Sequence, residues 1–111
     1  MKIFISQPMN GRTEEEILEE RQNLINAIKM QHDEEIEVID SYFENYNPTT
    51  GSIGLKYLAK SLELMADADM VYLTGGWDKA RGCKIEHDCA VAYGIPVCIW
   101  NPCCDCKAMI K

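Results

Sequence analysis

The sequence predicts an α/β fold in three layers, with a mostly parallel sheet of about four to five strands and helices on both faces, as in flavodoxin-like and Rossmann-like proteins. Three observations predict it. Short apolar segments alternate with helical segments along the chain, in the order β-α-β-α-β-α-β. Each strand segment is nearly all apolar, as expected for strands that are covered on both faces. The chain has 111 residues, so one domain over residues 1–111 is expected.

The strand segments are short, rich in β-branched and aromatic residues, and bounded by turn residues. They are "KIFIS" (2–6), "EIEVID" (35–40), "DMVYLT" (69–74) and "PVCIW" (96–100). In open parallel sheets, ligands bind in the crevice beyond the carboxyl ends of the strands. Three loops are therefore expected to meet at a ligand, namely residues 7–12, 40–52 and 74–81.

The helical segments are predicted over residues 13–32, 53–66 and 81–93, because apolar residues recur there at helical spacing. Thr13 and Glu16 form a capping box at the start of the first helix. The inward face of that helix is expected to hold Ile17, Leu18, Arg21, Leu24, Ile25 and Ile28. The inward face of the second is expected to hold Ile53, Tyr57, Leu58, Ser61, Leu62 and Met65.

The composition limits the partners and the location. A net charge of −7 argues against nucleic acid or an anionic membrane surface as the main partner, because both need clustered Lys and Arg. No apolar run has membrane-spanning length and no leader is visible, so a cytoplasmic protein is expected. The six cysteines are then expected to be free thiols. Cys103, Cys104 and Cys106 have C-C-x-C spacing instead of the usual zinc-site spacing, so no metal is predicted.

The predicted ligand loops carry residues with two alternative roles. In "QPMNGR" (7–12), Gly11 permits close backbone approach and the following helix N-terminus offers N–H groups. This suits a phosphate or a sugar, but an ordinary βα turn has the same composition. Trp77 follows two glycines in the third loop, where it either stacks on a base or covers the core. The same alternatives apply to Tyr42, Phe43 and Tyr46.

Glu86 is the candidate chemical group of the third helix. It lies about one and a half turns from Arg81, and helical side chains lean toward the N-terminus, so its carboxylate is expected to point toward the crevice. Arg81 and the helix N-terminus favour the ionised form, which suits a nucleophile. The alternative is a solvated surface glutamate. The apolar neighbours Ile85, Cys89 and Ala90 argue against that alternative.

With these residues in place, the chain resembles the nucleoside 2-deoxyribosyltransferase superfamily, and within it the small phage and bacterial members of unassigned function. The resemblance covers nearly the whole chain. It rests on "FISQPMNGR" (4–12), "ADADMVYLTGGW" (66–77) and "ARGCKIEHDCAVAYGIPV" (80–97). The first of these segments is also similar to the sugar-phosphate loop of the 2'-deoxynucleoside 5'-monophosphate N-glycosidases.

The resemblance implies that Glu86 attacks the anomeric carbon of a 2-deoxyribose and forms a covalent glycosyl-enzyme, which a second base or water then resolves. It implies a small-molecule nucleoside or nucleotide as ligand and no cofactor. The implied substrate-binding residues are Gln7, Pro8, Met9, Asn10, Gly11, Arg12, Asp69, Gly75, Gly76, Trp77, Asp78, Arg81 and Gly82. Among these, Asp69 conflicts with the topology, since the start of a strand lies at the opposite end of the sheet from the crevice.

Two departures from the family pattern leave two functions open. Ala80 stands six residues before Glu86, where family members carry Asp or Ser, and the first loop lacks the family's tyrosine. One hypothesis is an enzyme that transfers or hydrolyses the N-glycosidic bond, which Glu86 favours. The other is a non-catalytic sensor of a nucleotide or an ADP-ribose-type ligand, which Ala80 favours. The resemblance also implies a homo-oligomer, a dimer or higher, with the site completed by the C-terminal segment (100–111) of a neighbouring subunit.

Overall fold

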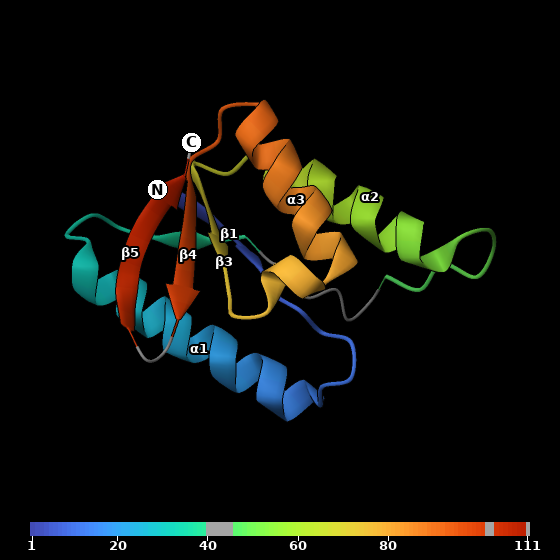
Figure 1. Ribbon diagram of the computed structural model, residues 1–111, viewed down its shortest axis with the longest axis horizontal. Coiled ribbons are helices and arrows are strands. Elements are labelled where there is room, and N and C mark those ends of the chain that lie inside the picture. The colour runs from blue at the N-terminus through green and yellow to red at the C-terminus, as the bar shows by residue number, and fades with distance from the viewer. Residues whose placement is uncertain (40–45, 102–103, 111) are drawn as a thin grey trace.

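A five-stranded sheet forms the centre of the molecule, with the strand order β2-β1-β3-β4-β5 (Figure 1). The computed structural model describes residues 1–39, 46–101 and 104–110, and side chains for residues 1–39 and 46–100. The strands are β1 (Lys2–Ser6), β2 (Glu37–Val38), β3 (Met70–Leu73), β4 (Val97–Asn101) and β5 (Cys104–Ile110). The first four are parallel to one another and β5 runs antiparallel to β4. The predicted fold class, a mostly parallel α/β sheet, is confirmed.

Three α-helices connect the parallel strands, together with a short 3-10 helix. They are α1 (Glu14–Gln31), α2 (Ile53–Met65), η1 (Trp77–Lys79) and α3 (Arg81–Ala92). The predicted capping box is present, with the Glu16 N–H donating to Thr13 Oγ1 at 3.1 Å and the Thr13 N–H donating to Glu16 Oε1 at 2.9 Å. The predicted helix over residues 81–93 ends at Ala92. Of the strand predicted over residues 35–40, Glu37 and Val38 form β2, which pairs with β1, and residue 40 lies outside the described residues.

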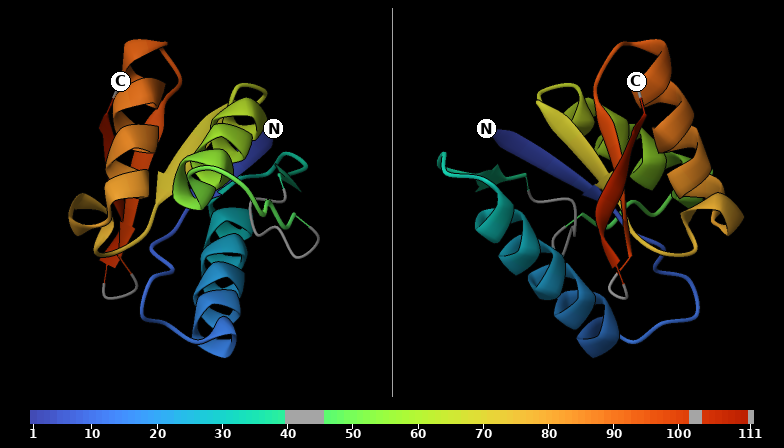
Figure 2. Two further views of the ribbon diagram at one scale, coloured as in Figure 1. Left: turned by 90° about the vertical axis from the view of Figure 1, so that its right-hand side faces the viewer. Right: turned by 60° about the vertical axis from the view of Figure 1, so that its left-hand side comes forward.

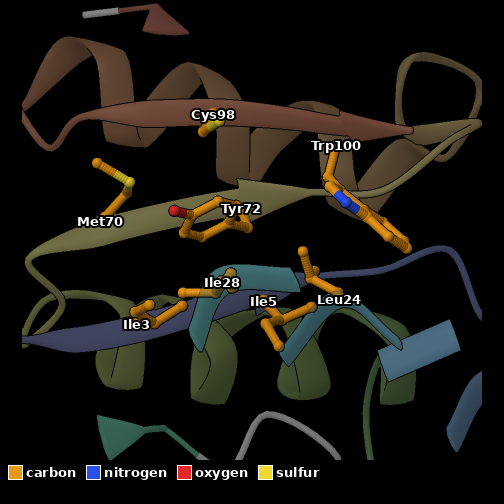
Figure 3. Packing of buried hydrophobic residues seen from close by; sticks show 8 residues of the cluster. All are labelled: Ile3, Ile5, Leu24, Ile28, Met70, Tyr72, Cys98 and Trp100. Atoms are coloured by element: carbon orange, nitrogen blue, oxygen red, sulfur yellow. The ribbon is translucent and has the colours of Figure 1, made fainter. Parts of the chain in front are cut away.

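The helices cover the two faces of the sheet unequally, with α1 on one face and both α2 and α3 on the other (Figure 2). Strand β1 shows why, since successive side chains of a strand point to opposite faces. Ile3 and Ile5 pack with Leu24 and Ile28 of α1 (Figure 3). Phe4 packs on the other face, in a cluster that includes buried residues of α2 and α3. Both faces of the sheet are therefore apolar and covered, as the strand sequences predict.

The predicted inward faces of the helices are partly wrong. On α1, Ile17, Arg21, Leu24 and Ile28 are buried, but Leu18 is 40% exposed. On α2, only Met65 is buried and Ile53 is 38% exposed. The reason is that α2 contacts the core with its C-terminal end, whereas its N-terminal half borders a cavity.

The C-terminal segment and the cysteines also correct the sequence analysis. Residues 104–110 form strand β5, which was not expected, and which pairs with β4 as an additional strand of the sheet. Cys83 and Cys89 are free thiols, as expected, but Cys98 is disulfide-bonded. Within the described part of the chain, no helix combines the length and the apolarity that crossing a bilayer requires.

Candidate functional site

A cavity of about 1030 Å³ opens beyond the carboxyl ends of the parallel strands, where the topology predicts a ligand. The loop after β1 and the first halves of α2 and α3 form its walls. The lining residues are Ile5, Gln7, Pro8, Met9, Asn10, Gly54, Tyr57, Leu58, Ser61, Gly76, Lys79, Ala80, Arg81, Gly82, Cys83 and Glu86. Eight of the fourteen site residues predicted from the sequence line this cavity, namely Gln7, Pro8, Met9, Asn10, Gly76, Arg81, Gly82 and Glu86.

Glu86 lies in the cavity wall and is only 7% exposed. Three elements position its carboxylate. Ser6, the last residue of β1, donates its hydroxyl to Glu86 Oε1 at 2.7 Å. Ser61 of α2 also hydrogen-bonds the carboxylate, and α3 carries the glutamate itself. The alternative of a solvated surface glutamate is excluded by this burial.

The electrostatics of Glu86 differ from the expectation. Burial raises the pKa of the carboxyl above its usual value, and the hydrogen bonds from Ser6 and Ser61 oppose that rise without cancelling it. Arg81, whose charge was expected to favour the ionised form, is an exposed residue and does not offset the effect of burial. Desolvation dominates because a carboxylate loses most of its hydration when it is enclosed by the sheet and two helices.

Replacing Glu86 by glutamine is expected to stabilise the fold at neutral and alkaline pH. A glutamate whose pKa is raised in the folded state adds stability below its ordinary unfolded-state value of 4.5, and that stability is lost as the pH rises through the folded pKa. Glutamine has no charge to desolvate and can still accept from Ser6. Thermal denaturation between about pH 4 and about pH 8 measures this effect. The melting temperature of the variant, relative to that of the wild type, should increase as the pH rises. Glu63→Gln, at an exposed position of α2, is the matched control, and an equal effect of the two variants would contradict the prediction.

Cys83 lies beside Glu86 but is not suited to act as a nucleophile. It is buried, and it lines the same cavity. Burial raises the pKa of the Cys83 thiol to about 11; a hydrogen bond with Ser6 lowers it, and the nearby Glu86 charge raises it. Since the thiolate is the reactive form, the thiol is inert near neutral pH. Glu86 is therefore the better candidate for nucleophilic chemistry.

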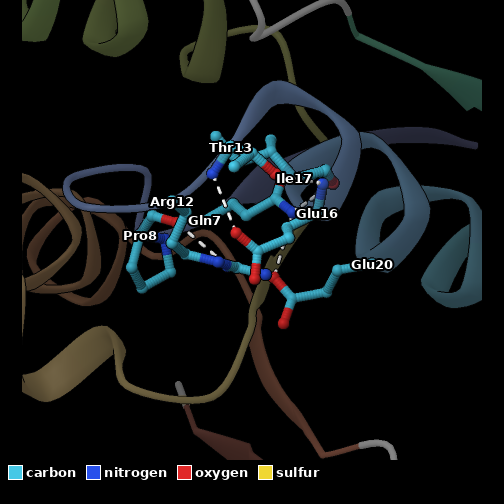
Figure 4. Close-up of polar contacts among 7 residues, drawn as sticks. All are labelled: Gln7, Pro8, Arg12, Thr13, Glu16, Ile17 and Glu20. Carbon is cyan, nitrogen blue, oxygen red and sulfur yellow. Dashed lines mark hydrogen bonds and ion pairs between the residues drawn. The ribbon is translucent and has the colours of Figure 1, made fainter.

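The loop after β1 is held by a polar network around Glu20, a residue of α1 (Figure 4). Gln7 donates its side-chain amide to the Ile17 carbonyl at 2.7 Å and to Glu20 Oε1 at 3.0 Å. Arg12 donates to Glu20 Oε1 at 2.9 Å and to the Pro8 carbonyl at 3.1 Å. Arg12 was expected to hold a sugar or a phosphate. Its guanidinium instead pairs with Glu20 and braces the loop, and Arg12 does not line the cavity.

The positive charge at the cavity comes from Lys79 and Arg81. Among the residues whose side chains are described, neither forms an ion pair. A Cβ atom at Gly54 would lie 3.6 Å from Arg81 Nη2, so the guanidinium lies beside the first turn of α2. Two cations thus stand beside a cavity whose wall also contains the N-terminal turn of α3, which suits an anionic ligand group.

The ring of Trp77, which was expected either to stack on a base or to cover the core, contacts another side chain of the protein. It stacks on His87, with the ring centroids 4.5 Å apart and an angle of 30° between the planes. It packs at the edge of the apolar cluster beneath α2 and α3, and it does not line the cavity. Of the two alternatives for Trp77, the structure supports the cover over the core. Tyr42 and Phe43 lie outside the described residues.

Asp69 lies at the opposite end of the sheet from the cavity. Its Oδ2 accepts from the Lys2 N–H at 2.7 Å, and its own N–H donates to the Lys2 carbonyl at 2.8 Å. These bonds join the amino ends of β1 and β3, as the topology predicts for the start of a strand. Gly11, Gly75 and Asp78 also do not line the cavity.

Several cavity residues were not singled out as ligand contacts from the sequence. These are Ser6, which holds Glu86, and Gly54, Tyr57, Leu58, Ser61 and Lys79, which line the cavity. Of these, Tyr57, Leu58 and Ser61 were assigned to the inward face of the second helix. The sequence contains a signal for a cavity at this helix. Ser61 places a hydroxyl on an otherwise apolar helix face, and Gly54 has no side chain to fill the space beside it.

No curated protein and no solved structure matches the chain. Residues 1–99 match the family described as a domain of unknown function, DUF4406. The match spans β1 to the greater part of β4, all three α-helices and every cavity residue. Because it covers most of the sequence, the chain belongs to the DUF4406 family.

Proposed function

We propose that the protein breaks, or exchanges the base of, the N-glycosidic bond of a 2'-deoxynucleoside or its 5'-monophosphate, with Glu86 as the nucleophile. One observation carries the proposal. A buried carboxylate, hydrogen-bonded by Ser6 and Ser61, stands in the wall of a large cavity at the carboxyl edge of a parallel sheet. Fixed, desolvated carboxylates of this kind act on glycosidic bonds.

In the first step, a carboxylate oxygen of Glu86 forms a bond to the anomeric carbon while the carbon–nitrogen bond breaks. The base leaves with the bonding electron pair and takes up a proton from water. The transition state carries positive charge on the sugar, which a poorly hydrated carboxylate stabilises more strongly than water would. In the second step, water or another base attacks the same carbon, loses a proton, and releases the Glu86 carboxylate. The configuration at the anomeric carbon is retained.

The cations Lys79 and Arg81 favour the 5'-monophosphate over the nucleoside as substrate. Arg81 precedes Glu86 by five residues on α3, which corresponds to a rise of about 7.5 Å along the helix. In a nucleotide, the phosphate is joined to the anomeric carbon through the furanose ring and one methylene group. In the proposed binding mode, a single ligand places its phosphate at Arg81 and its anomeric carbon at Glu86.

Arg81→Ala is expected to raise the KM for a 2'-deoxynucleoside 5'-monophosphate by about tenfold or more, because a charge-assisted hydrogen bond is lost. The KM for the unphosphorylated nucleoside should not change. Steady-state kinetics with both substrates measure the difference. Lys84→Ala removes an exposed cation of α3 that does not line the cavity, and it should leave both KM values unchanged. Equal loss with both substrates would show that Arg81 does not contact the phosphate.

The proposed activity is tested by product analysis. The protein is incubated with the four 2'-deoxynucleosides and their 5'-monophosphates, with and without a second free base, and the products are separated by chromatography. Release of free base supports hydrolysis, and a new nucleoside or nucleotide supports transfer. No product from any substrate at high protein concentration would overturn the proposal.

A second candidate function is a sensor that binds the same class of ligand without turnover. The observation that favours it is Ala80, which lines the cavity with a methyl group where the resembling enzymes carry Asp or Ser. In addition, Glu86 is the only carboxylate among the described cavity-lining residues, so no second acid is present there to protonate the leaving base. Saturable nucleotide binding without product would support this function.

A further inference from the structure

We propose that the side-chain carbonyl of Gln7 accepts a hydrogen bond from the 3'-hydroxyl of the nucleotide sugar. This inference rests on the proposed function and adds to it a contact that selects the substrate. Gln7 lines the cavity and is only 6% exposed. Its Oε1 is buried and has no hydrogen-bond partner among the residues that the structure describes.

The amide of Gln7 is held in one orientation by α1 (Figure 4). Its Nε2 donates to the Ile17 carbonyl at 2.7 Å and to Glu20 Oε1 at 3.0 Å, so both amide hydrogens are used. The Ile17 carbonyl can only accept, and Glu20 Oε1 also accepts from Arg12 at 2.9 Å. Exchanging the oxygen and the nitrogen of the Gln7 amide would therefore break both bonds. The group that this amide leaves for a ligand is thus an acceptor.

The unpaired oxygen of Gln7 lies away from these contacts with α1. Ile17 and Glu20 do not line the cavity, so the nitrogen side of the amide faces α1 and the oxygen side does not. A buried carbonyl oxygen without a donor destabilises the protein that contains it, and nearly all such groups in folded proteins are paired. A ligand that brings a donor to Gln7 Oε1 recovers this loss on binding.

The hydrogen-bonding character of Oε1 identifies the ligand group. The oxygens of a phosphate act mainly as acceptors, so they do not pair with a carbonyl oxygen. A sugar hydroxyl can donate. The loop over residues 7–12 was expected to bind either a phosphate or a sugar, and the free acceptor of Gln7 favours the sugar.

The place of Gln7 in the chain favours the 3'-hydroxyl. Gln7 directly follows Ser6, whose hydroxyl donates to Glu86 Oε1 at 2.7 Å, and Gln7 and Glu86 line the same cavity. In the proposed binding mode, the furanose ring lies between Glu86 and Arg81, beside the start of this loop. The ring of a 2'-deoxynucleoside 5'-monophosphate carries one free hydroxyl, at the 3' position. That hydroxyl is therefore the donor assigned to Gln7.

The test is a set of calorimetric titrations with 2'-deoxyadenosine 5'-monophosphate and with 2',3'-dideoxyadenosine 5'-monophosphate, which lacks the 3'-hydroxyl. All chains carry Glu86→Gln, so that the nucleotide is not consumed. This parent is expected to bind the dideoxynucleotide about tenfold or more weakly, because Oε1 then stays unpaired. Gln7→Met keeps the length of the side chain without the acceptor and should bind both nucleotides equally. Gln22→Met, the same change at an exposed glutamine of α1, is the control and should keep the difference.

A second measurement uses the parent alone, because Gln7→Met also removes the two bonds to α1. The side-chain carbonyl carbons of the glutamines are labelled with carbon-13 and observed by NMR. The Gln7 resonance should shift when the 2'-deoxynucleotide binds and shift much less with the dideoxynucleotide. The exposed Gln22 and Gln31 provide reference resonances that neither ligand should move. An equal shift of the Gln7 resonance with both nucleotides would contradict the contact.

The titrations separate failure of this inference from failure of the proposed function. Equal affinity of the parent for the two nucleotides would overturn the Gln7 contact, while the binding itself would leave the proposed function standing. A difference that persists in Gln7→Met would also overturn the contact, because another group would then pair with the hydroxyl. If the parent binds neither nucleotide, the proposed function and this inference both fail.

Discussion

Glu86→Gln is expected to lower the turnover of a 2'-deoxynucleotide by roughly a thousandfold or more, which is the usual scale for removing a nucleophile. Glutamine keeps the shape of the side chain and can accept the hydrogen bond from Ser6, whose hydroxyl lies 2.7 Å from Glu86 Oε1. In the proposed mechanism, it removes the negative charge that stabilises the oxocarbenium-like transition state and forms the glycosyl-enzyme. The loss should therefore fall on kcat, with little change in nucleotide affinity.

Single-turnover kinetics and equilibrium binding on the same variant measure the two effects separately. Glu63→Gln removes one negative charge from an exposed position on α2, so it controls for the change in net charge. Wild-type protein mixed with substrate and quenched in acid should also carry a deoxyribosyl group on the peptide that contains Glu86, detected by mass spectrometry. Wild-type turnover in Glu86→Gln would assign the chemistry to another group and contradict the mechanism.

Phe4→Ala is expected to lower the free energy of unfolding by about 3–5 kcal/mol, a large part of the stability of a domain of this size. Phe4 is 1% exposed and lies in β1, which pairs with a strand on each side. Its side chain packs in the cluster beneath α2 and α3, and removing the ring leaves a void there. Urea unfolding followed by circular dichroism measures the loss.

Tyr93→Ala is the matched control for this prediction, because it removes an aromatic ring that is 84% exposed. Its effect should stay within about 0.5 kcal/mol. Phe4 and Ser6 point to the same face of β1, since they are two residues apart. Partial collapse around an alanine at position 4 should therefore also disturb the support of Glu86. A loss below about 1 kcal/mol would show that this face of the sheet is loosely packed.

The elements of the fold follow from short-range patterns, which is why most of them could be predicted. The apolar run of β1 and the capping box at Thr13 depend on neighbouring residues alone. Strand β5 was missed because its sequence lacks a clear strand pattern and its pairing partner, β4, supplies the hydrogen bonds. Strand β2 was predicted over residues 35–40, but only Glu37 and Val38 pair with β1, and residue 40 lies outside the described residues.

For the candidate site too, the sequence predicts what depends on local patterns and not what depends on distant residues. The location of the site follows from the sequence, because parallel strands that alternate with helices place their ligand loops at one edge of the sheet. Most of the residues from Gln7 to Asn10 and from Arg81 to Glu86 line the cavity at that edge. The roles of individual residues could not be predicted where a distant partner decides them. Arg12 forms an ion pair with Glu20, and the ring of Trp77 stacks on the ring of His87.

The sequence by itself determined the α/β fold class, the edge of the sheet at which the cavity lies, and the placement of Glu86 in the first half of α3. Only the tertiary structure decided that Ser6 and Ser61 hold this carboxylate, that burial raises its pKa, and that Tyr57 is the aromatic ring in the cavity wall. The physical reason is that periodicity and capping are local properties of the chain. Hydration and hydrogen-bond partners depend instead on residues such as Ser6, which lies 80 positions from Glu86 and meets it only in the folded protein.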